Sequence, residues 1–154
     1  MEELDLGRLL KGREFINVAT TSPDAKPNCA PKMILEAKER EICLVDYTIG
    51  RTLENLRRDK RVSLSFMDLD NLTGYQLNGT VGLLDKGPEF DRRSAEFQRR
   101  TLQLSASRVI EGARTGKHYE HFELEIPERL VFYQVAVEEI VRIGLHGEIE
   151  RLSS

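Results

Sequence analysis

The sequence predicts a mainly β fold, a small antiparallel barrel of six or seven strands with flanking helices. Short segments rich in Val, Ile and Thr alternate between apolar and polar residues, as half-buried strands do. Many connections are too short for the crossovers that parallel strands need, so antiparallel hairpins fit better. The 154 residues, 40% of them hydrophobic, suit one domain with a continuous core.

The first half of the chain combines short helices with strands. A helix from Leu4 to Leu10 should end at Gly12, and Leu53 and Leu56, three residues apart, predict the buried face of a second helix. The expected elements after the first helix are strands at Phe15–Thr21, Asn28–Glu36 and Glu41–Tyr47, a helix at Gly50–Arg58, and strands at Arg61–Met67 and Thr73–Leu84.

The second half begins with a helical insertion over about residues 88–118. Gly87-Pro88 should open it, because Pro is favoured in the first turn of a helix. We expect this helix to break near Ser105–Ser107 or at Gly112. Strands should follow at Phe122–Ile126, Arg129–Val135 and Val137–Ile143. The tail from Gly144 should be exposed, with Leu145 and Ile149 free to dock on a partner. Residues 1–154 then form a single domain.

Three residues inside the predicted strands affect the backbone. Pro31 cannot donate a ladder hydrogen bond, so we expect an interruption near it that leaves neighbouring backbone groups free. Gly79 and Gly82 in the fifth strand indicate bends or a close approach of two backbones.

Composition limits the class of protein. The net charge of −3 does not favour a nucleic-acid binder, which usually carries a basic excess. Cys29 and Cys43 lie in apolar, strand-like segments without CxxC spacing, which indicates a reducing compartment. Residues 1–10 lack the apolar run of a signal peptide, and no segment approaches the length of a membrane helix. We therefore expect a cytoplasmic protein that binds neither nucleic acid nor membrane.

The segment Leu44–Leu56 is the first candidate site, because a strand ends and a helix begins within it. The start of a helix offers free N–H groups and partial positive charge, which suit a phosphate. Arg51 adds a fork-shaped cation, Thr48 and Thr52 add hydroxyl groups, and Lys32 on the preceding strand adds a second cation. The same residues also fit an ordinary capped helix with a solvated arginine.

The second strand is the other half of this candidate site. Asn28, Ala30 and Lys32 should point to one face, and Cys29 and Pro31 to the other. Small residues and an extended backbone can present donors and acceptors to a flat ring such as an isoalloxazine. An irregular edge strand is the alternative interpretation.

Seven segments together resemble the pyridoxamine 5′-phosphate oxidase-related FMN-binding proteins, particularly the small FMN-binding split-barrel proteins. The likeness extends over roughly residues 13–90, and the order and spacing of the segments carry it. These segments are Phe15–Thr20, Lys26–Lys32, Ile42–Tyr47, Arg51–Leu56, Arg61–Leu64, Gly74–Val81 and Gly87–Phe90.

This resemblance implies an FMN-binding split β-barrel with Greek-key-like order. It also implies a homodimer with each flavin at the subunit interface, where Leu130–Val141 is our candidate for the second wall. In the family, the phosphate is held by the residues that match Arg51 and Thr52. The flavin ring lies along the strands that match Asn28–Lys32 and Val45–Thr48. The implied cofactor-binding residues are Asn28, Cys29, Ala30, Pro31, Lys32, Val45, Asp46, Tyr47, Thr48, Arg51 and Thr52.

The function that follows is an FMN-dependent oxidoreductase or electron-transfer protein, with NADH, NADPH or a protein as electron donor. Pyridoxamine-phosphate oxidase activity itself is not expected, because those oxidases have an Arg- and Trp-rich C-terminal segment and this chain has no Trp. The alternatives are a non-enzymatic FMN-binding or sensing module of the same fold, and a binder of deazaflavin or heme.

Three further features have ordinary explanations. His118 and His121 would share a helix face but lack a clear third metal ligand, so we expect no metal. Cys29 is expected to be a small buried hydrophobe rather than a reactive thiol. The basic run over residues 91–100 should be a solvated helix face with internal ion pairs. No GxGxxG, GxxxxGK[ST] or GxSxG motif is present.

Overall fold

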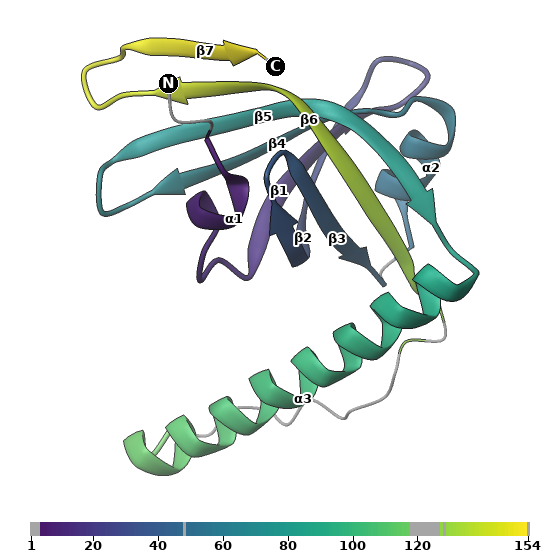
Figure 1. Cartoon of the computed structure of the whole chain (residues 1–154), viewed down its shortest axis with the longest axis vertical. Coiled ribbons are helices and arrows are strands. Elements are labelled where there is room, and N and C mark those ends of the chain that lie inside the picture. The colour runs from purple at the N-terminus through teal and green to yellow at the C-terminus, as the bar shows by residue number, and fades with distance from the viewer. Residues whose placement is uncertain (1–3, 48, 118–126, 128, 154) are drawn as a thin grey trace.

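A computed structural model of the chain describes residues 4–47, 49–117, 127 and 129–153. Six antiparallel strands close into a barrel in the order β3-β2-β1-β4-β5-β6, because β3 also pairs with β6 (Figure 1). A seventh strand, β7, extends the sheet beside β6. The elements are α1 (Leu6–Leu9), β1 (Phe15–Thr21), β2 (Pro27–Lys38), β3 (Glu41–Asp46), α2 (Arg51–Arg58), β4 (Arg61–Asp68), β5 (Thr73–Leu84), α3 (Pro88–Thr115), β6 (Val131–Ile143) and β7 (Ile149–Ser153).

The mainly β barrel confirms the predicted fold class. Strands β1 and β5 have the predicted bounds, and burial alternates along β1 and β4 as the sequence pattern requires. Strand β4 lies beside β1, so the first four strands have the spatial order 4-1-2-3 of a Greek key.

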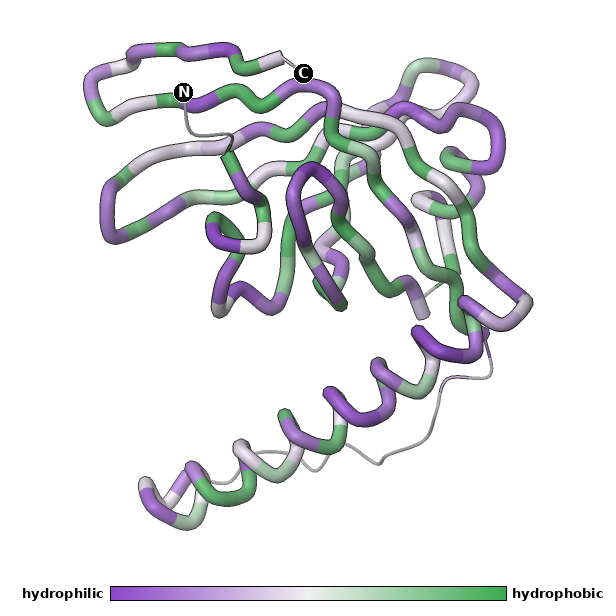
Figure 2. The backbone as a smooth tube through the Cα atoms, viewed as in Figure 1, coloured by the Kyte–Doolittle hydropathy of each residue, from purple (hydrophilic) through white to green (hydrophobic). Residues whose placement is uncertain are grey.

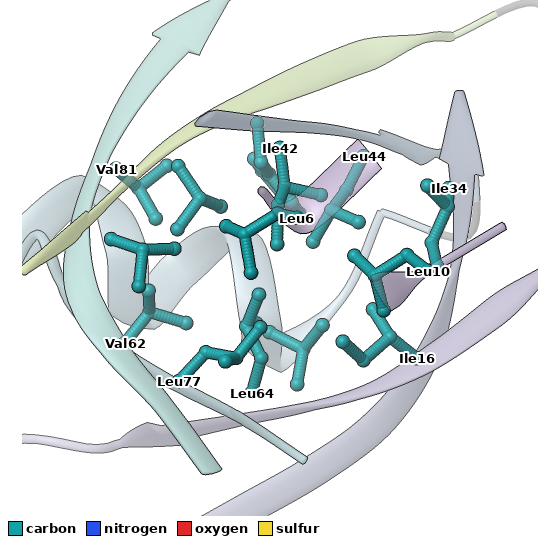
Figure 3. Packing of buried hydrophobic residues seen from close by; sticks show 14 of the residues in the cluster. Leu6, Leu10, Ile16, Ile34, Ile42, Leu44, Val62, Leu64, Leu77 and Val81 are labelled. Atoms are coloured by element: carbon teal, nitrogen blue, oxygen red, sulfur yellow. The ribbon is translucent and has the colours of Figure 1, made fainter. Parts of the chain in front are cut away.

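The barrel interior is filled by aliphatic side chains from every barrel strand. Helix α1 closes one end, and Figure 3 shows Leu6 surrounded by side chains that include Ile42, Leu44 and Leu64. Leu6 has no solvent exposure. Asp5 fixes this helix by accepting hydrogen bonds from the N–H groups of Gly7 and Glu39, at 2.9 Å each. A four-residue helix without such packing would not persist in water.

Helix α3 differs from the prediction, because it runs without a break from Pro88 to Thr115. Ser105–Ser107 and Gly112 lie inside the helix. A glycine within a helix costs only about 1 kcal/mol, which an otherwise helical segment can tolerate. The helix ends instead at Gly116, whose φ of 69° gives the left-handed conformation that favours glycine.

The C-terminal strands also differ from the prediction. The two strands predicted at Arg129–Val135 and Val137–Ile143 are one continuous strand, since Ala136 pairs with both Glu41 and Thr80. The tail is exposed as predicted, with Leu145 62% and Ile149 64% exposed, but Ile149–Ser153 also forms a strand that was not predicted and that pairs with β6. The strand predicted at Phe122–Ile126 lies outside the described residues.

Gly79 allows the close backbone approach that the sequence indicated. The β5–β6 register shifts between Asn78 and Gly79, and a Cβ on Gly79 would lie 2.0 Å from the carbonyl oxygen of Ala136. That oxygen belongs to the backbone, so it cannot move aside without disturbing the ladder.

Replacing Gly79 with Ala is therefore expected to lower the free energy of unfolding by about 1–3 kcal/mol, measured by urea denaturation. Gly82→Ala is the matched control on the same strand, because its Cβ would meet its nearest atom, an oxygen of Gln134, at 3.8 Å. The control should change stability by less than about 1 kcal/mol. Equal losses for the two variants would contradict this explanation.

Candidate functional site

The first turn of α2 has no side-chain cap from its own N-cap residue. Gly50 is the N-cap residue and has no side chain with which to cap the helix, so no side-chain cap hydrogen bond is made. The N–H of Glu54 bonds to the carbonyl of Gly50 at 3.2 Å. Arg51 is exposed at this end of the helix. Helix starts offer N–H groups without helical partners and partial positive charge, and this one also carries an exposed guanidinium group.

Thr52 is not the N-cap residue, although an ordinary capped helix was one interpretation of the sequence. It is 3% exposed, and its hydroxyl oxygen accepts a hydrogen bond from the Asn28 side-chain amide at 3.1 Å. Thr48 lies outside the described residues. The amide of Asn28 also lies 3.3 Å from the hydroxyl of Thr20, which accepts from Asn55 at 3.0 Å. These contacts hold α2 against β1 and β2.

Strand β2 is unpaired on one side over its first half. The N–H of Ile34 donates to the carbonyl of Glu14 just before β1. Because the direction of the backbone groups alternates along a strand, the N–H groups of Lys32 and Ala30 also point to β1. The backbone groups of Cys29 and Pro31 therefore face the other side. The last β2–β3 pair on that side is Met33 with Val45, so no described strand pairs with Cys29 or Pro31 there.

The interruption expected at Pro31 does not occur. Strand β2 continues through Pro31, which pairs with Asn17 of β1, and the irregularity lies between Ile34 and Glu36. The missing N–H of Pro31 faces the unpaired side, so no ladder hydrogen bond is lost. We call the first turn of α2, together with Cys29 and Pro31 on this open edge, the β2–α2 corner.

A buried ion pair inside the barrel, behind this corner, joins β2 to β3. The ammonium of Lys32 is 2.7 Å from one carboxylate oxygen of Asp46, and Tyr133 donates its hydroxyl to the other at 2.5 Å. Lys32 is 6% exposed, Asp46 1% and Tyr133 0%. Burial and the neighbouring Asp46 carboxylate raise the pKa of the Tyr133 hydroxyl far above its usual range. Lys32 therefore has a carboxylate partner inside the barrel.

The remaining predicted site residues divide into exposed and buried groups. Cys29, Pro31 and Tyr47 are exposed, Ala30 is half-buried, and Val45 is buried. The exposure of Cys29 contradicts the expectation that it is a buried hydrophobe. The ring of Tyr47 stacks on Phe97 of α3 with ring centroids 6.1 Å apart. Thr20 and Asn55 join the site without having been predicted, although strand alternation places Thr20 opposite Asn28.

Cys43 lies outside the predicted site, beside a hollow of about 430 Å³ on the outer barrel surface. Burial raises the pKa of its thiol to about 11. Arg92 and Arg93 of α3 also line this hollow, and both pair with Glu89, at 2.7 and 2.8 Å. Arg99 pairs with Glu96 at 2.6 Å, so the basic run has the predicted internal ion pairs, but it is not a wholly solvated face, because Arg93 also pairs with Glu36 of the barrel.

No helix within the described ranges is both long and apolar enough to span a membrane. In the same part of the chain, no three His, Cys, Asp or Glu side chains are placed together as metal ligands. His118 and His121 lie outside it.

The family is established by comparison with known proteins. Residues 6–144 match the family described as pyridoxamine 5′-phosphate oxidase, and the chain belongs to that family. Curated protein sequences give no match. The family resemblance carried by the seven sequence segments and the six-stranded closed barrel therefore agree on the same fold.

Solved structures with this fold carry different names. A pyridoxamine 5′-phosphate oxidase-related, FMN binding protein from Nostoc punctiforme has a TM-score of 0.62 at 15% identity, covering 94% of this chain and 82% of that one. An F420 reductase has a TM-score of 0.56 at 15% identity, covering 86% and 93%. A heme binding protein from Mycobacterium smegmatis has a TM-score of 0.58 at 14% identity, covering 91% and 52%. At these identities the likeness shows the fold alone.

Proposed function

We propose that the chain binds FMN noncovalently at the β2–α2 corner and acts as an FMN-dependent oxidoreductase or electron-transfer protein. One observation carries this proposal: a helix start with a glycine N-cap and an exposed arginine lies next to a strand edge that no described strand pairs with. The N–H groups of the first turn of α2 and the guanidinium of Arg51 would hold the phosphate. Thr52 would act mainly by fixing α2 to Asn28.

The open edge of β2 suits the flavin ring. An isoalloxazine needs both donors and acceptors along its pyrimidine edge. The backbone N–H and C=O of Cys29 and the C=O of Pro31 face the unpaired side and supply both. The bound flavin would supply hydride or electron transfer, while these residues would orient it. The Lys32–Asp46 pair would keep β2 and β3 at a fixed separation beneath the ring.

A second copy of the chain would complete the site. The segment Leu130–Val141, suggested by the sequence as the second wall, is used elsewhere, because its large apolar side chains in β6 are buried in this chain's own core. The outer face of β1 and β4 is a better candidate. There Cys29 pairs with Ala19, and Ala19 pairs with Ser63, so a small and uncharged surface adjoins the open edge.

Titration of the apoprotein with FMN tests the proposal. We expect a yellow complex of micromolar or tighter affinity, and slower alkylation of Cys29 when FMN is bound. Cys43 is the internal control, because burial raises the pKa of its thiol to about 11 and keeps it unreactive with or without FMN. Failure to bind FMN at millimolar concentration would overturn the proposal.

Two alternatives remain distinguishable by simple measurements. Tight FMN binding without reduction by NADH, NADPH or a protein donor would favour a non-enzymatic binding or sensing module. The neighbours named F420 reductase and heme binding protein make deazaflavin and heme the competing ligands. The absorption spectrum of the purified protein separates all three. We assign the protein to the cytoplasm, since both cysteines are free.

A further inference from the structure

Helix α3 has apolar side chains on two opposite faces. Its 28 residues make it about 42 Å long at 1.5 Å per residue. Phe90, Phe97 and Leu104 lie on one face and pack against the barrel. At about 100° per residue, Leu102 and Val109 lie on the opposite face. A surface helix normally has only one apolar face, so the second one requires an explanation.

The second face is exposed along the distal half of α3. Leu102 is 53% exposed, Val109 58% and Ile110 68%. Ala106 and Ala113 lie between and beyond them on the same face and are also exposed. Figure 2 shows this half of the helix extending away from the barrel. We call these five residues the α3 stripe.

A matching apolar surface lies on the outer face of the barrel. Met67 pairs with Gly74, Gly74 with Ile143, and Ile143 with Ile149, so these residues form a row across neighbouring strands. Phe15 continues the row on β1. Asn17 pairs with Ser65, and in this antiparallel pair Phe15 lies two residues before Asn17 and Met67 two residues after Ser65, so Phe15 lies opposite Met67. We call this set the apolar row. Its four large side chains are each at least 41% exposed.

The loops at the ends of these strands enlarge the apolar row. Leu69, Leu72 and Leu145 add exposed side chains. Together they give this end of the barrel seven of the eleven exposed large hydrophobic residues among those the structure describes. A hollow of about 260 Å³ lies beside the row and is lined by residues that include Phe15, Met67 and Leu69. Contiguous exposed apolar patches of this kind mark interaction sites.

The stripe and the row match in length. From Leu102 to Ala113 the stripe extends about 16 Å along the helix. Four strand spacings, from β1 through β4, β5 and β6 to β7, extend about 19 Å. Helix α3 cannot place its stripe on its own row, because its other face is held on the barrel by Phe97 and by Arg100, which donates to the carbonyl of Leu35.

The loop beside the row is acidic and the end of α3 is basic, although one cation, Arg13, also lies beside the row and donates to the carbonyl of Met67. Asp68 at the end of β4 and Asp70 in the loop between β4 and β5 are acidic residues beside the row. A side-chain hydrogen bond from Asn71 lowers the pKa of Asp68, which keeps it ionised at neutral pH. The end of α3 and the two residues that follow it carry Arg108, Arg114 and Lys117 against a single acid, Glu111, in residues 105–117. Attraction between these opposite charges favours the orientation in which the basic end of α3 lies next to the acidic loop of the second copy.

We infer that the α3 stripe of one protomer docks on the apolar row of a second copy, and that the exchange is reciprocal. This inference rests on the dimer in the proposed function and identifies the segments that form it. A twofold axis makes each contact twice, so one chain supplies both halves of the interface. The row is one pleat away from Pro31 and Asn17 on the outer face, so the docked helix would lie beside the β2–α2 corner.

Two single substitutions and their mixture test this inference in the full-length protein with FMN. Ile110→Lys changes the stripe and Met67→Glu changes the row. Each should raise the dimer dissociation constant at least about a hundredfold by sedimentation, because the contact occurs twice. Thr115→Lys on the opposite side of α3 from the stripe, and Gln134→Glu on the outer face of β6, should leave the dimer unchanged. Both residues are exposed.

An equimolar mixture of the two variants should restore a dimer. In that heterodimer one contact joins the new lysine to the new glutamate, and the other contact is native. If both single variants dimerise like the unmodified protein, the inference is wrong while the proposed flavin dimer stands. If the mixture stays monomeric, the stripe and the row do not meet. A monomer that binds FMN before any substitution would overturn both the dimer and the inference, but not the flavin site.

Discussion

Replacing Asp46 with Asn is expected to lower the free energy of unfolding by about 3–5 kcal/mol. The substitution removes the carboxylate that lies 2.7 Å from the Lys32 ammonium, while Lys32 remains buried. It also changes the acceptor for the Tyr133 hydroxyl. Urea denaturation with circular dichroism measures the loss, and the urea dependence should be unchanged because the fold is retained.

A double variant separates the charge effect from the effect of changed packing. Replacing both charges, as Lys32→Met with Asp46→Leu, removes the pair without leaving one charge in the barrel. That variant should be clearly more stable than Asp46→Asn alone, because buried ion pairs often add little net stability over apolar residues. Tyr133→Phe should cost less than Asp46→Asn, about 1–3 kcal/mol, since Asp46 keeps Lys32.

A loss below about 1 kcal/mol for Asp46→Asn would show that the pair is solvated in solution and does not fix the two strands. The suggested role of the pair beneath the flavin ring would then fail. The phosphate contact at Arg51 would not be affected, because Arg51 lies on the outer side of the corner.

The barrel strands could be predicted because local pattern and tertiary burial agree. In β1 and β4, every buried position is apolar or, at Thr20, accepts hydrogen bonds, and turn residues mark the strand ends. Strand β7 within the exposed tail could not be predicted in this way. In β7, Ile149 is 64% exposed, so no alternating burial marks the strand. It forms because β6 extends beyond β3 and offers a free edge.

The predicted breaks in α3 and β6 were wrong for a related reason, because tertiary contacts outweigh the local sequence signal in both elements. Gly112 and Ser105–Ser107 lower helix propensity locally, but propensity is a weak guide within a long helix whose first half is fixed by Phe97. Ala136 separates two apolar runs in the sequence. It remains in one strand because both β3 and β5 pair with it.

The position of the candidate site could be predicted, but the contacts that each of its residues makes could not. A strand end followed by a helix start is visible in the sequence, as is the alternation from Asn28 to Lys32. The orientation of Lys32 toward Asp46 depends on β6, because Tyr133 of that strand donates its hydroxyl to the Asp46 carboxylate. Tyr133 lies more than eighty residues further along the chain than Asp46. The contact between Thr20 and Asn55 depends on the packing of α2 on β1.

Arg51→Ala is expected to weaken FMN binding by about ten- to a hundredfold while changing riboflavin binding little. The guanidinium is proposed to contact the phosphate, which riboflavin lacks, and a charge-assisted hydrogen bond is stronger than a neutral one. Titration of each apoprotein with both ligands, followed by flavin fluorescence, gives the two affinities. Added salt should reduce the difference, because the contact is exposed.

Arg57→Ala is the matched control, because Arg57 is an exposed arginine in the last turn of the same helix. It removes the same charge from α2 at the end where the helix dipole does not favour an anion, so FMN affinity should stay within about twofold. Equal loss of FMN and riboflavin in Arg51→Ala would mean that the arginine supports the ring or the fold. Equal loss of FMN in both arginine variants would mean that net charge attracts the ligand, and the first turn of α2 would lose its role as the phosphate site.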